Sequence, residues 1–174
     1  TAAESTHQTH ANDLSDREFQ TKRILLVDDN RSIHQDYRKI LCKHLNETQT
    51  QLNEEEEFLF NAENQEAETR TRFELTSVYQ GDDAIVEVQN RIDNDEPPFE
   101  LAFVDVRMPP GIDGLSTVEQ LWKIDPRLQV ILCTAFSDFT LDEIMSRLGE
   151  SDRLLILKKP FDQEEVRLLA ISLM

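Results

Sequence analysis

The feature that most constrains the fold is a set of five short strand-like segments, each followed by a stretch of helical periodicity. Three of them are nearly continuous apolar runs, which is typical of strands covered on both faces. Another alternates apolar and polar side chains, as a half-covered strand does. The segments span residues 23–30, 72–80, 100–105, 129–135 and 153–161. This order predicts an α/β fold in which a parallel sheet, joined by right-handed crossovers, carries helices on both faces.

The stretches between these segments repeat apolar residues at spacings of three and four, which predicts a helix after every strand. Ser32 is the expected N-cap of the first helix and Asp162 that of the last, which we expect to reach Met174. Pro126 is expected to end the third helix. The apolar face of the first helix comprises Ile33, Tyr37, Ile40, Leu41 and Leu45.

The overall charge excludes some kinds of partner. The chain has 174 residues and a formal net charge of −17. Surfaces that bind nucleic acids or anionic membranes need clustered Lys and Arg, so we expect this chain to contact neither. There is no apolar run of the roughly 18 residues that a membrane helix needs, and no secretory signal is visible, so we expect a cytoplasmic location. Because the chain starts at Thr1 and not at Met, we expect it to be part of a longer protein.

The chain divides by composition into a tail and one domain. Residues 1–21 are polar and without periodicity, which indicates a tail or linker, and residues 22–174 form the predicted domain. Residues 46–70 interrupt it with an acidic insertion that contains one apolar patch, Phe58-Leu59-Phe60. The insertion is expected to be a solvated segment or an extra acidic helix, and the alternative is a docking segment anchored by this patch. The topology of the sheet would place it on the edge-strand side, away from the strand ends that carry the polar residues.

The cysteines and the histidine of the first helix have ordinary interpretations. Cys42 and Cys133 lie in apolar stretches without zinc-ligand spacing, so both are expected to be buried thiols in a reducing compartment. His34 lies on the first predicted helix, where a surface or partly buried histidine is expected.

Polar side chains stand where four of the apolar segments finish. Asp28 and Asp29 follow the first, and the third, fourth and fifth end in Asp105, Thr134 and Lys159. Because the carboxyl ends of parallel strands meet at one edge of the sheet, these side chains are expected to converge. Clustered carboxylates need a cation to offset their repulsion, and oxygen ligands suit Mg²⁺. A carboxylate nucleophile beside such an ion can form an aspartyl phosphate, so the pattern predicts phosphoryl transfer.

The same residues carry a resemblance to a known family. The VDD sequence after the first segment, the Asp in FVDVRMP, the Thr-Ala pair and KKPF are similar to motifs of the receiver domains of bacterial response regulators. The resemblance covers about residues 22–174. It implies a flavodoxin-like (βα)₅ doubly wound sheet with strand order 2-1-3-4-5, and a signalling function in a two-component system.

By this resemblance, the metal ligands are Asp28, Asp29, Asp105 and the main-chain carbonyl of Arg107. The ion they imply is Mg²⁺, with Mn²⁺ as an alternative. The resemblance also makes Asp105 the phosphoacceptor, so one carboxylate would both hold the ion and accept the phosphoryl group.

The resemblance also implies how the signal is passed. Thr134 is the switch hydroxyl and Lys159 is the phosphate partner. The phosphoryl donor is a phosphohistidine on a histidine kinase or a phosphotransfer protein. An output domain in the parent chain, such as that of a hybrid sensor kinase or a cyclic-dinucleotide enzyme, would respond, and a homodimer is compatible with this function.

Three features depart from the family pattern. Ile156 stands three residues before Lys159, where the family often has an aromatic residue that reports phosphorylation. The loop MPPGIDG after Asp105 is one residue longer than the commonest pattern, with Gly111 as the addition, which is expected to reshape the loop without moving Asp105. The acidic insertion at 46–70 is longer than the family requires.

Two other function classes are weighed against this one. A phosphatase of the haloacid-dehalogenase type also forms an aspartyl phosphate, but it usually needs a second acid two residues after the nucleophile, where this chain has Arg107. A receiver that has lost phosphorylation would act by contact alone. The acid pair, Asp105, Thr134 and Lys159 are all present, which disfavours that interpretation.

Overall fold

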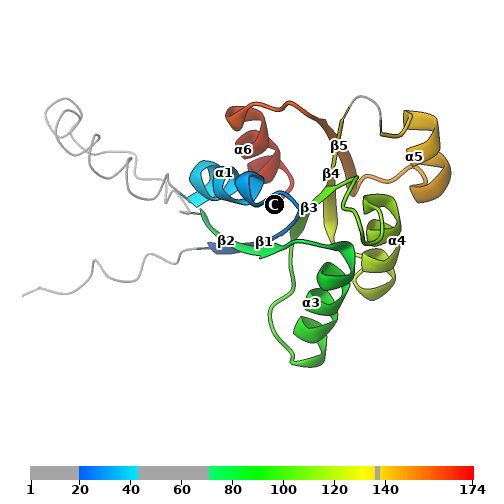
Figure 1. Cartoon of the computed structure of the whole chain (residues 1–174). Helices are drawn as coiled ribbons and strands as arrows, with labels where there is room; N and C mark the ends of the chain where they lie inside the picture. The colour runs from blue at the N-terminus through cyan, green and yellow to red at the C-terminus, as the bar shows by residue number, and fades with distance from the viewer. Residues whose placement is uncertain (1–19, 43–70, 136–137) are drawn as a thin grey trace, which may run out of the picture.

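The computed structural model describes residues 20–42, 71–135 and 138–174, which form one five-stranded parallel sheet with helices on both faces (Figure 1). The strand order is β2-β1-β3-β4-β5. The strands are β1 Gln20–Val27, β2 Thr71–Val78, β3 Leu101–Asp105, β4 Gln129–Thr134 and β5 Leu154–Lys158. The helices are α1 Arg31–Cys42, α3 Gly81–Asp93, α4 Gly114–Ile124, α5 Leu141–Leu148 and α6 Gln163–Ser172. The predicted fold class and strand order are confirmed.

Two apolar layers fill the space between the sheet and its helices. In β1, Ile24 and Leu26 pack toward α1 and α6, while Leu25 and Val27 pack toward α3, α4 and α5. The alternation follows from the strand pleat, and all four side chains are at most 1% exposed. Figure 1 shows α1 and α6 side by side on one face of the sheet, with α3 and α4 on the other. A sheet covered in this way leaves only the ends of its strands open to a ligand.

The helix starts correct one predicted cap and confirm another. Ser32 does not cap α1, because the helix already begins at Arg31 and the side chain of Asn30 accepts from the Ser32 N–H at 3.0 Å. Asp162 caps α6 as predicted, since its carboxylate accepts from the N–H groups of Glu164 and Glu165. The last helix ends at Ser172, two residues before the predicted end.

The prediction of a buried thiol is confirmed for Cys133 and wrong for Cys42. Cys133 lies inside β4 and is 3% exposed. Its Sγ lies 3.4 Å from the hydroxyl of Tyr37, and burial raises its pKa to about 12. Cys42 is exposed because it stands one turn after Arg38, on the outward face of α1, whereas Leu41 points to the core.

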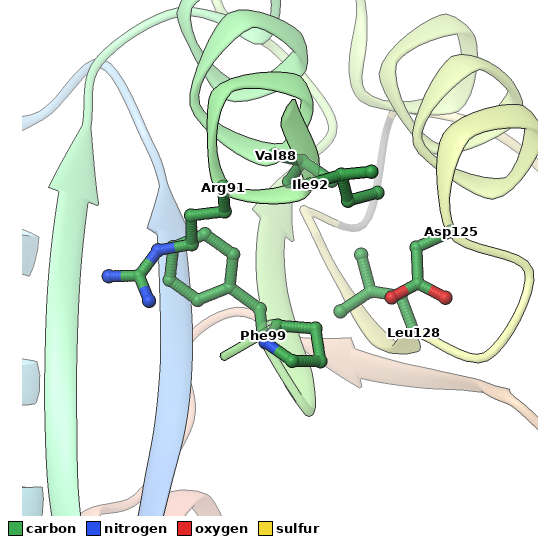
Figure 2. A pocket seen from close by; sticks show the side chains of 7 residues that line it. Val88, Arg91, Ile92, Phe99, Asp125 and Leu128 are labelled. Atoms are coloured by element: carbon green, nitrogen blue, oxygen red, sulfur yellow. The ribbon is translucent and has the colours of Figure 1, made fainter. Parts of the chain in front are cut away.

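A small hollow near the amino end of β3 is lined by packed side chains, as Figure 2 shows. The guanidinium of Arg91 lies over the ring of Phe99, 4.3 Å from its centroid, and donates to the carbonyl of Pro97. Val88 and Leu128 are buried beside them. This hollow therefore offers little room for a ligand. The carboxyl edge of the sheet carries the polar residues predicted to bind one.

Several predictions fall on residues that the structure does not describe. The acidic insertion at 46–70 and Leu45 lie outside the described residues, as does the predicted tail except for Gln20 and Thr21, which belong to β1. The neighbouring strand β2 is an edge strand, as predicted. None of the helices in the described ranges has the length and apolar character needed to cross a bilayer.

Candidate functional site

The carboxyl edge of the sheet gathers the polar residues singled out in the sequence. Asp28 and Asp29 follow β1 directly, and Asp105 is the last residue of β3. Thr134 is the last residue of β4, and Lys159 comes directly after β5. The register pairs Val27 with Val104, Asp105 with Cys133 and Thr134 with Lys158, so these strands finish at the same level. The predicted convergence on one edge is confirmed.

Three carboxylates form the centre of this edge. One oxygen each from Asp28, Asp29 and Asp105 lies within 4.8 Å of the others. Asp28 and Asp105 are 2% and 8% exposed, whereas Asp29 is exposed. We refer to these three residues, together with Lys159, as the acid–lysine cluster. Its donor set is made of carboxylate oxygens, the ligands that hard cations such as Mg²⁺ prefer, and Asp29 keeps one side of it open to solvent.

Lys159 joins two of the three acids. Its ammonium nitrogen donates to Asp28 Oδ2 at 2.9 Å and to Asp105 Oδ1 at 2.8 Å. Its side chain is 25% exposed, so the charge lies between the protein interior and water. One positive charge therefore faces two buried negative charges, and the acid–lysine cluster keeps a negative charge that favours a cation.

The surroundings shift the proton affinities of Asp105 and Lys159. Burial raises the pKa of Asp105, and the charge of Asp28 raises it further, although hydrogen bonding to Lys159 works in the opposite direction. For Lys159, burial alone would lower the pKa, but the hydrogen bonds to Asp105 and Asp28 outweigh it and raise the pKa to about 12. Lys159 is therefore an ammonium group at neutral pH, whereas the surroundings of Asp105 disfavour its charged form.

The backbone at Asp28 is held by neighbours on both sides. The N–H of Asn30 donates to Asp28 Oδ1 at 2.8 Å. The main-chain carbonyl of Asp28 lies 2.6 Å from His34 Nε2, and since a carbonyl only accepts, Nε2 must carry the proton. The ring of His34 is 3% exposed and packs against that of Tyr79. His34 is thus buried, and it fixes the turn that carries the acid pair.

The end of β4 carries a second polar group, whose hydrogen bonds go to residues that follow β4. The hydroxyl of Thr134 donates to the carbonyl of Ala135 at 3.0 Å and lies 3.4 Å from Asp138 Oδ2. The Ala135 N–H donates to the same Asp138 oxygen at 2.6 Å. The guanidinium of Arg107 lies 2.5 Å from Asp138 Oδ1, which ties the loop after β3 to the loop after β4. We call Thr134, Ala135, Asp138 and Arg107 the switch-loop cluster.

The longer loop after Asp105 is held at two points. The Gly111 N–H donates to Gln80 Oε1 at 3.1 Å, so the additional residue is bound by the turn before α3. At Gly114, a Cβ atom would lie 2.3 Å from the carbonyl oxygen of Asp105, which makes a side chain impossible without moving the backbone. Asp105 is the last residue of β3, directly before this loop.

Sequence reasoning missed the contacts of His34, Asp138 and the Arg107 side chain. His34 lies in the first turn of α1, shortly after Asp28. This short separation along the chain could have indicated its contact with the Asp28 main chain. Asp138 and Arg107 belong to different loops, and their pairing depends on how the loops fold over the edge. The sequence contains no periodic signal for such a pair.

The sequence also matches a known protein family. The model of the response regulator receiver domain family matches residues 51–170, more than half of the chain. The chain belongs to the response regulator receiver domain family. The matched range contains Asp105, Thr134 and Lys159, while the acid pair of this receiver domain precedes it. As a member of the family, the chain is a phosphoacceptor signalling domain.

Individual proteins agree with this assignment. The receiver domain is 31% identical over 68 residues to the sporulation initiation phosphotransferase F of Bacillus subtilis, covering 39% of this chain and 52% of that protein. It is 26% identical over 95 residues to the transcriptional regulatory protein ZraR of Salmonella typhimurium, covering 55% of this chain and 19% of that protein. The chain thus spans about a fifth to a half of the length of these relatives.

Solved structures share the fold. A CheY-like response regulator receiver domain protein from Methanospirillum hungatei is 19% identical, with a TM-score of 0.59 over 88% of this chain and 93% of that one. The BeF₃-activated receiver domain of DrrB is 18% identical, with a TM-score of 0.55 over 88% of this chain and 97% of that one. Receiver domains bind Mg²⁺ at an acidic pocket, and the cluster of Asp28, Asp29 and Asp105 fits such an ion.

Proposed function

We propose that this receiver domain accepts a phosphoryl group on Asp105 from a phosphohistidine of a histidine kinase or a phosphotransfer protein. The observation that carries the proposal is the bridge that Lys159 makes between Asp28 and Asp105, inside a cluster of oxygen ligands. An ammonium group placed there can pair with the incoming phosphoryl group and offset its charge. An oxygen of Asp105 would bond to phosphorus as the bond to the histidine nitrogen breaks, and that nitrogen keeps the electron pair.

The ion-binding residues of the proposal are Asp28, Asp29, Asp105 and the main-chain carbonyl of Arg107. Mg²⁺, or Mn²⁺ in its place, would neutralise the phosphoryl oxygens when bound. The protein prepares these groups in advance. Asn30 orients the Asp28 carboxylate, His34 holds its main chain, and the exposed Asp29 leaves an entrance from solvent. Little reorganisation is then needed when the donor arrives.

The proposed response is a switch at Thr134. A phosphoryl group on Asp105 is a hydrogen-bond acceptor next to the end of β4, and the Thr134 hydroxyl would turn toward it. The loop after β4 borders a hollow of about 720 Å³, which is lined by Thr134, Phe139 and Ile144 among others and in which Ile156 replaces the family's usual aromatic residue. Movement of Thr134 would alter this hollow and bias a pre-existing equilibrium on the face of α5, β5 and α6.

The proposal extends to the parent protein only in outline. Residues 22–174 would form the receiver domain, with an output domain elsewhere in a longer, cytoplasmic chain. The relatives of this domain are longer than the part that it matches, which is compatible with such an arrangement. The net charge of −17 supports partners other than nucleic acid or anionic membranes, and a homodimer through the face of α5, β5 and α6 is consistent with the exposed Leu141, Leu168 and Ile171.

Intact mass spectrometry after exposure to acetyl phosphate tests the proposal. The parent protein is expected to gain one phosphoryl group when Mg²⁺ is present and none when the ion is chelated, because the clustered acids otherwise repel the donor. Asp105→Asn is expected to gain none under either condition. Equal labelling of Asp105→Asn and the parent would show that the acceptor lies elsewhere. A folded parent that is never labelled would favour a receiver that acts by contact alone.

The loop after Asp105 disfavours the alternative that this protein is a phosphatase of the haloacid-dehalogenase type. The residue two positions after Asp105 is Arg107, and its guanidinium is engaged by Asp138. No acid is therefore available at the position where that enzyme class places its general acid. Catalytic turnover of a simple phosphate ester by the purified domain would restore this alternative.

A further inference from the structure

The switch-loop cluster holds Thr134 in an arrangement that the proposed phosphorylated state cannot share. In the structure, the hydroxyl of Thr134 is directed to the Ala135 carbonyl and to Asp138. A hydroxyl has one proton, so it donates fully to one acceptor at a time. Thr134 would therefore have to leave these acceptors before it could donate to a phosphoryl group on Asp105.

Asp138 is the acceptor that organises the cluster. Its side chain is 6% exposed, and its carboxylate receives the Ala135 N–H at 2.6 Å and the Arg107 guanidinium at 2.5 Å. Hydrogen bonds to a charged group are stronger than those between neutral groups. The nearly buried carboxylate is thus well satisfied where it stands, and it would lose these donors if the loop moved.

Arg107 connects this cluster to the acceptor loop. It follows Asp105 by two residues, and its side chain is 64% exposed, so most of the group lies in solvent while its Nε is bound to Asp138. The pair joins the loop after β3 to the loop after β4. The pair therefore connects Asp105 to Asp138 by a route that does not pass through Thr134.

We propose that Asp138, anchored by Arg107, is a latch that stabilises the resting arrangement of Thr134 and Ala135 and opposes the phosphorylated one. The proposal rests on the proposed function, in which Thr134 donates to the phosphoryl group. The Thr134 hydroxyl donates to the Ala135 carbonyl, and Asp138 holds Ala135 in place through its N–H. A phosphoryl group on Asp105 competes with this arrangement for the hydroxyl, and its arrival releases the contacts of Asp138. Asp138 is a positioning residue in this scheme, because it acts through Thr134.

Binding of BeF₃⁻, a stable mimic of the phosphoryl group, measures the latch directly. At saturating Mg²⁺, the full chain carrying Asp138→Asn is expected to bind BeF₃⁻ about 5-fold or more tightly than the parent, the order of a modest coupling between two sites. Arg107→Gln keeps the main-chain carbonyl and frees Asp138, so it is expected to shift affinity in the same direction. In both free variants, the Ile156 δ-methyl resonance should move toward its position in the parent complex.

The control is Asp142→Asn, which removes the same charge from an exposed position in the first turn of α5. It is expected to bind BeF₃⁻ as the parent does. Parent-like or weaker binding by both Asp138→Asn and Arg107→Gln, with Ile156 unshifted, would overturn the latch while leaving the proposed function in place. A folded parent that does not bind BeF₃⁻ at all would remove the proposed function, and the latch with it.

Discussion

The two polar clusters at the carboxyl edge of the sheet differ in how ready they are for chemistry. In the acid–lysine cluster, Lys159 already contacts Asp28 and Asp105, and the acids lie within 4.8 Å of one another. In the switch-loop cluster, the groups are equally well paired, but with one another, since Thr134 and Ala135 both face Asp138. The acid–lysine cluster is thus arranged to receive a phosphoryl group, whereas the contacts of the switch-loop cluster belong to the unphosphorylated state.

This difference locates the reaction and the response in separate parts of the molecule. The acids stand at the ends of central strands, where β1 and β3 are packed on both faces and leave little freedom. The switch-loop cluster starts at Thr134, the last residue of β4, and its other members lie between β3 and α4 or between β4 and α5, where hydrogen bonds can be exchanged. Switching between two conformations requires such a combination, in which the phosphoacceptor is held rigidly and the neighbouring segment can exchange its hydrogen bonds.

The largest expected effect on stability comes from Gly114, the first residue of α4, whose backbone packs closely against that of Asp105. In Gly114→Ala, the new Cβ would lie 2.3 Å from the Asp105 carbonyl oxygen and 2.8 Å from Val106 Cα, both of which are backbone atoms. Because backbone cannot move aside as a side chain can, we expect a loss of about 3 kcal/mol in the free energy of unfolding. Urea denaturation measures this loss, and labelling by acetyl phosphate should fall because Asp105 is displaced.

Gly111→Ala is the matched control in the same loop. Its Cβ would approach Gln80 Oε1 at 2.3 Å, which is the end of a flexible side chain. Gln80 can rotate away at the cost of its hydrogen bonds to the loop, so we expect a loss of about 1 kcal/mol or less and normal labelling. Equal effects of the two substitutions would show that the acceptor's position does not depend on the close contact at Gly114.

The next effect tests the balance of charge in the acid–lysine cluster. Lys159→Met leaves the buried carboxylates of Asp28 and Asp105 without their shared ammonium group. Breaking a buried ion pair strongly destabilises a protein, but Lys159 is partly exposed, so we expect a loss of about 2 kcal/mol without divalent ions at neutral pH. Added Mg²⁺ should restore part of the stability, and restore more than it adds to the parent, as thermal unfolding with and without the ion would show.

Lys158→Met is the comparison for that prediction. Lys158 is the neighbouring residue, it is exposed, and it lies on β5. Its removal deletes the same charge from the chain, so a general effect of net charge would appear in both variants. We expect Lys158→Met to unfold as the parent does, within about 0.5 kcal/mol. If the two variants lose the same stability, the contacts of Lys159 with Asp28 and Asp105 are not what holds the cluster together.

The fold could be predicted because its signals are local and repeated. The apolar run that ends in Asp28 and the one that ends in Asp105 each predicted a buried strand and its polar end. What failed were details that depend on a single residue. Asn30 took the capping place expected for Ser32, because the helix begins at Arg31, two residues before the apolar pattern starts at Ile33. Cys42 turned outward because it lies about 100° around α1 from Leu41, on the side of the exposed Arg38.

The candidate site was predictable to the extent that its residues end strands. Strand ends align when the sheet forms, so the positions of Asp28, Asp105 and Lys159 in the sequence were enough to bring them together. Asp138 could not be placed in this way, because its position depends on how the loop after β4 folds back over Thr134. The distinction is physical, since a strand end is fixed by register and a loop residue by contacts that no periodic pattern encodes.

The start of α5 fixes the chain shortly after Asp138. Thr140 caps this helix, with its hydroxyl accepting from the Glu143 N–H while the Glu143 carboxylate accepts from the Thr140 N–H at 2.7 Å and from its hydroxyl at 2.9 Å. These hydrogen bonds hold the pKa of Glu143 below its usual value. The cap lies two residues after Asp138, so it anchors the far end of the segment that carries the latch.

The smallest expected effect therefore comes from this cap, and it depends on pH. Thr140→Ala should lose about 1 kcal/mol of stability at neutral pH, as measured by urea denaturation, because one capping acceptor is removed. Glu143→Gln should be less stable than the parent at neutral pH. Because the folded protein lowers the Glu143 pKa, its contribution is present above the usual value near 4.5 and is lost as the pH falls through the lowered one. The parent and Glu143→Gln should thus converge in acid. A difference between them that stays constant across this range would mean that the charge of Glu143 does not stabilise the cap, and that the loop carrying Asp138 is anchored by other contacts.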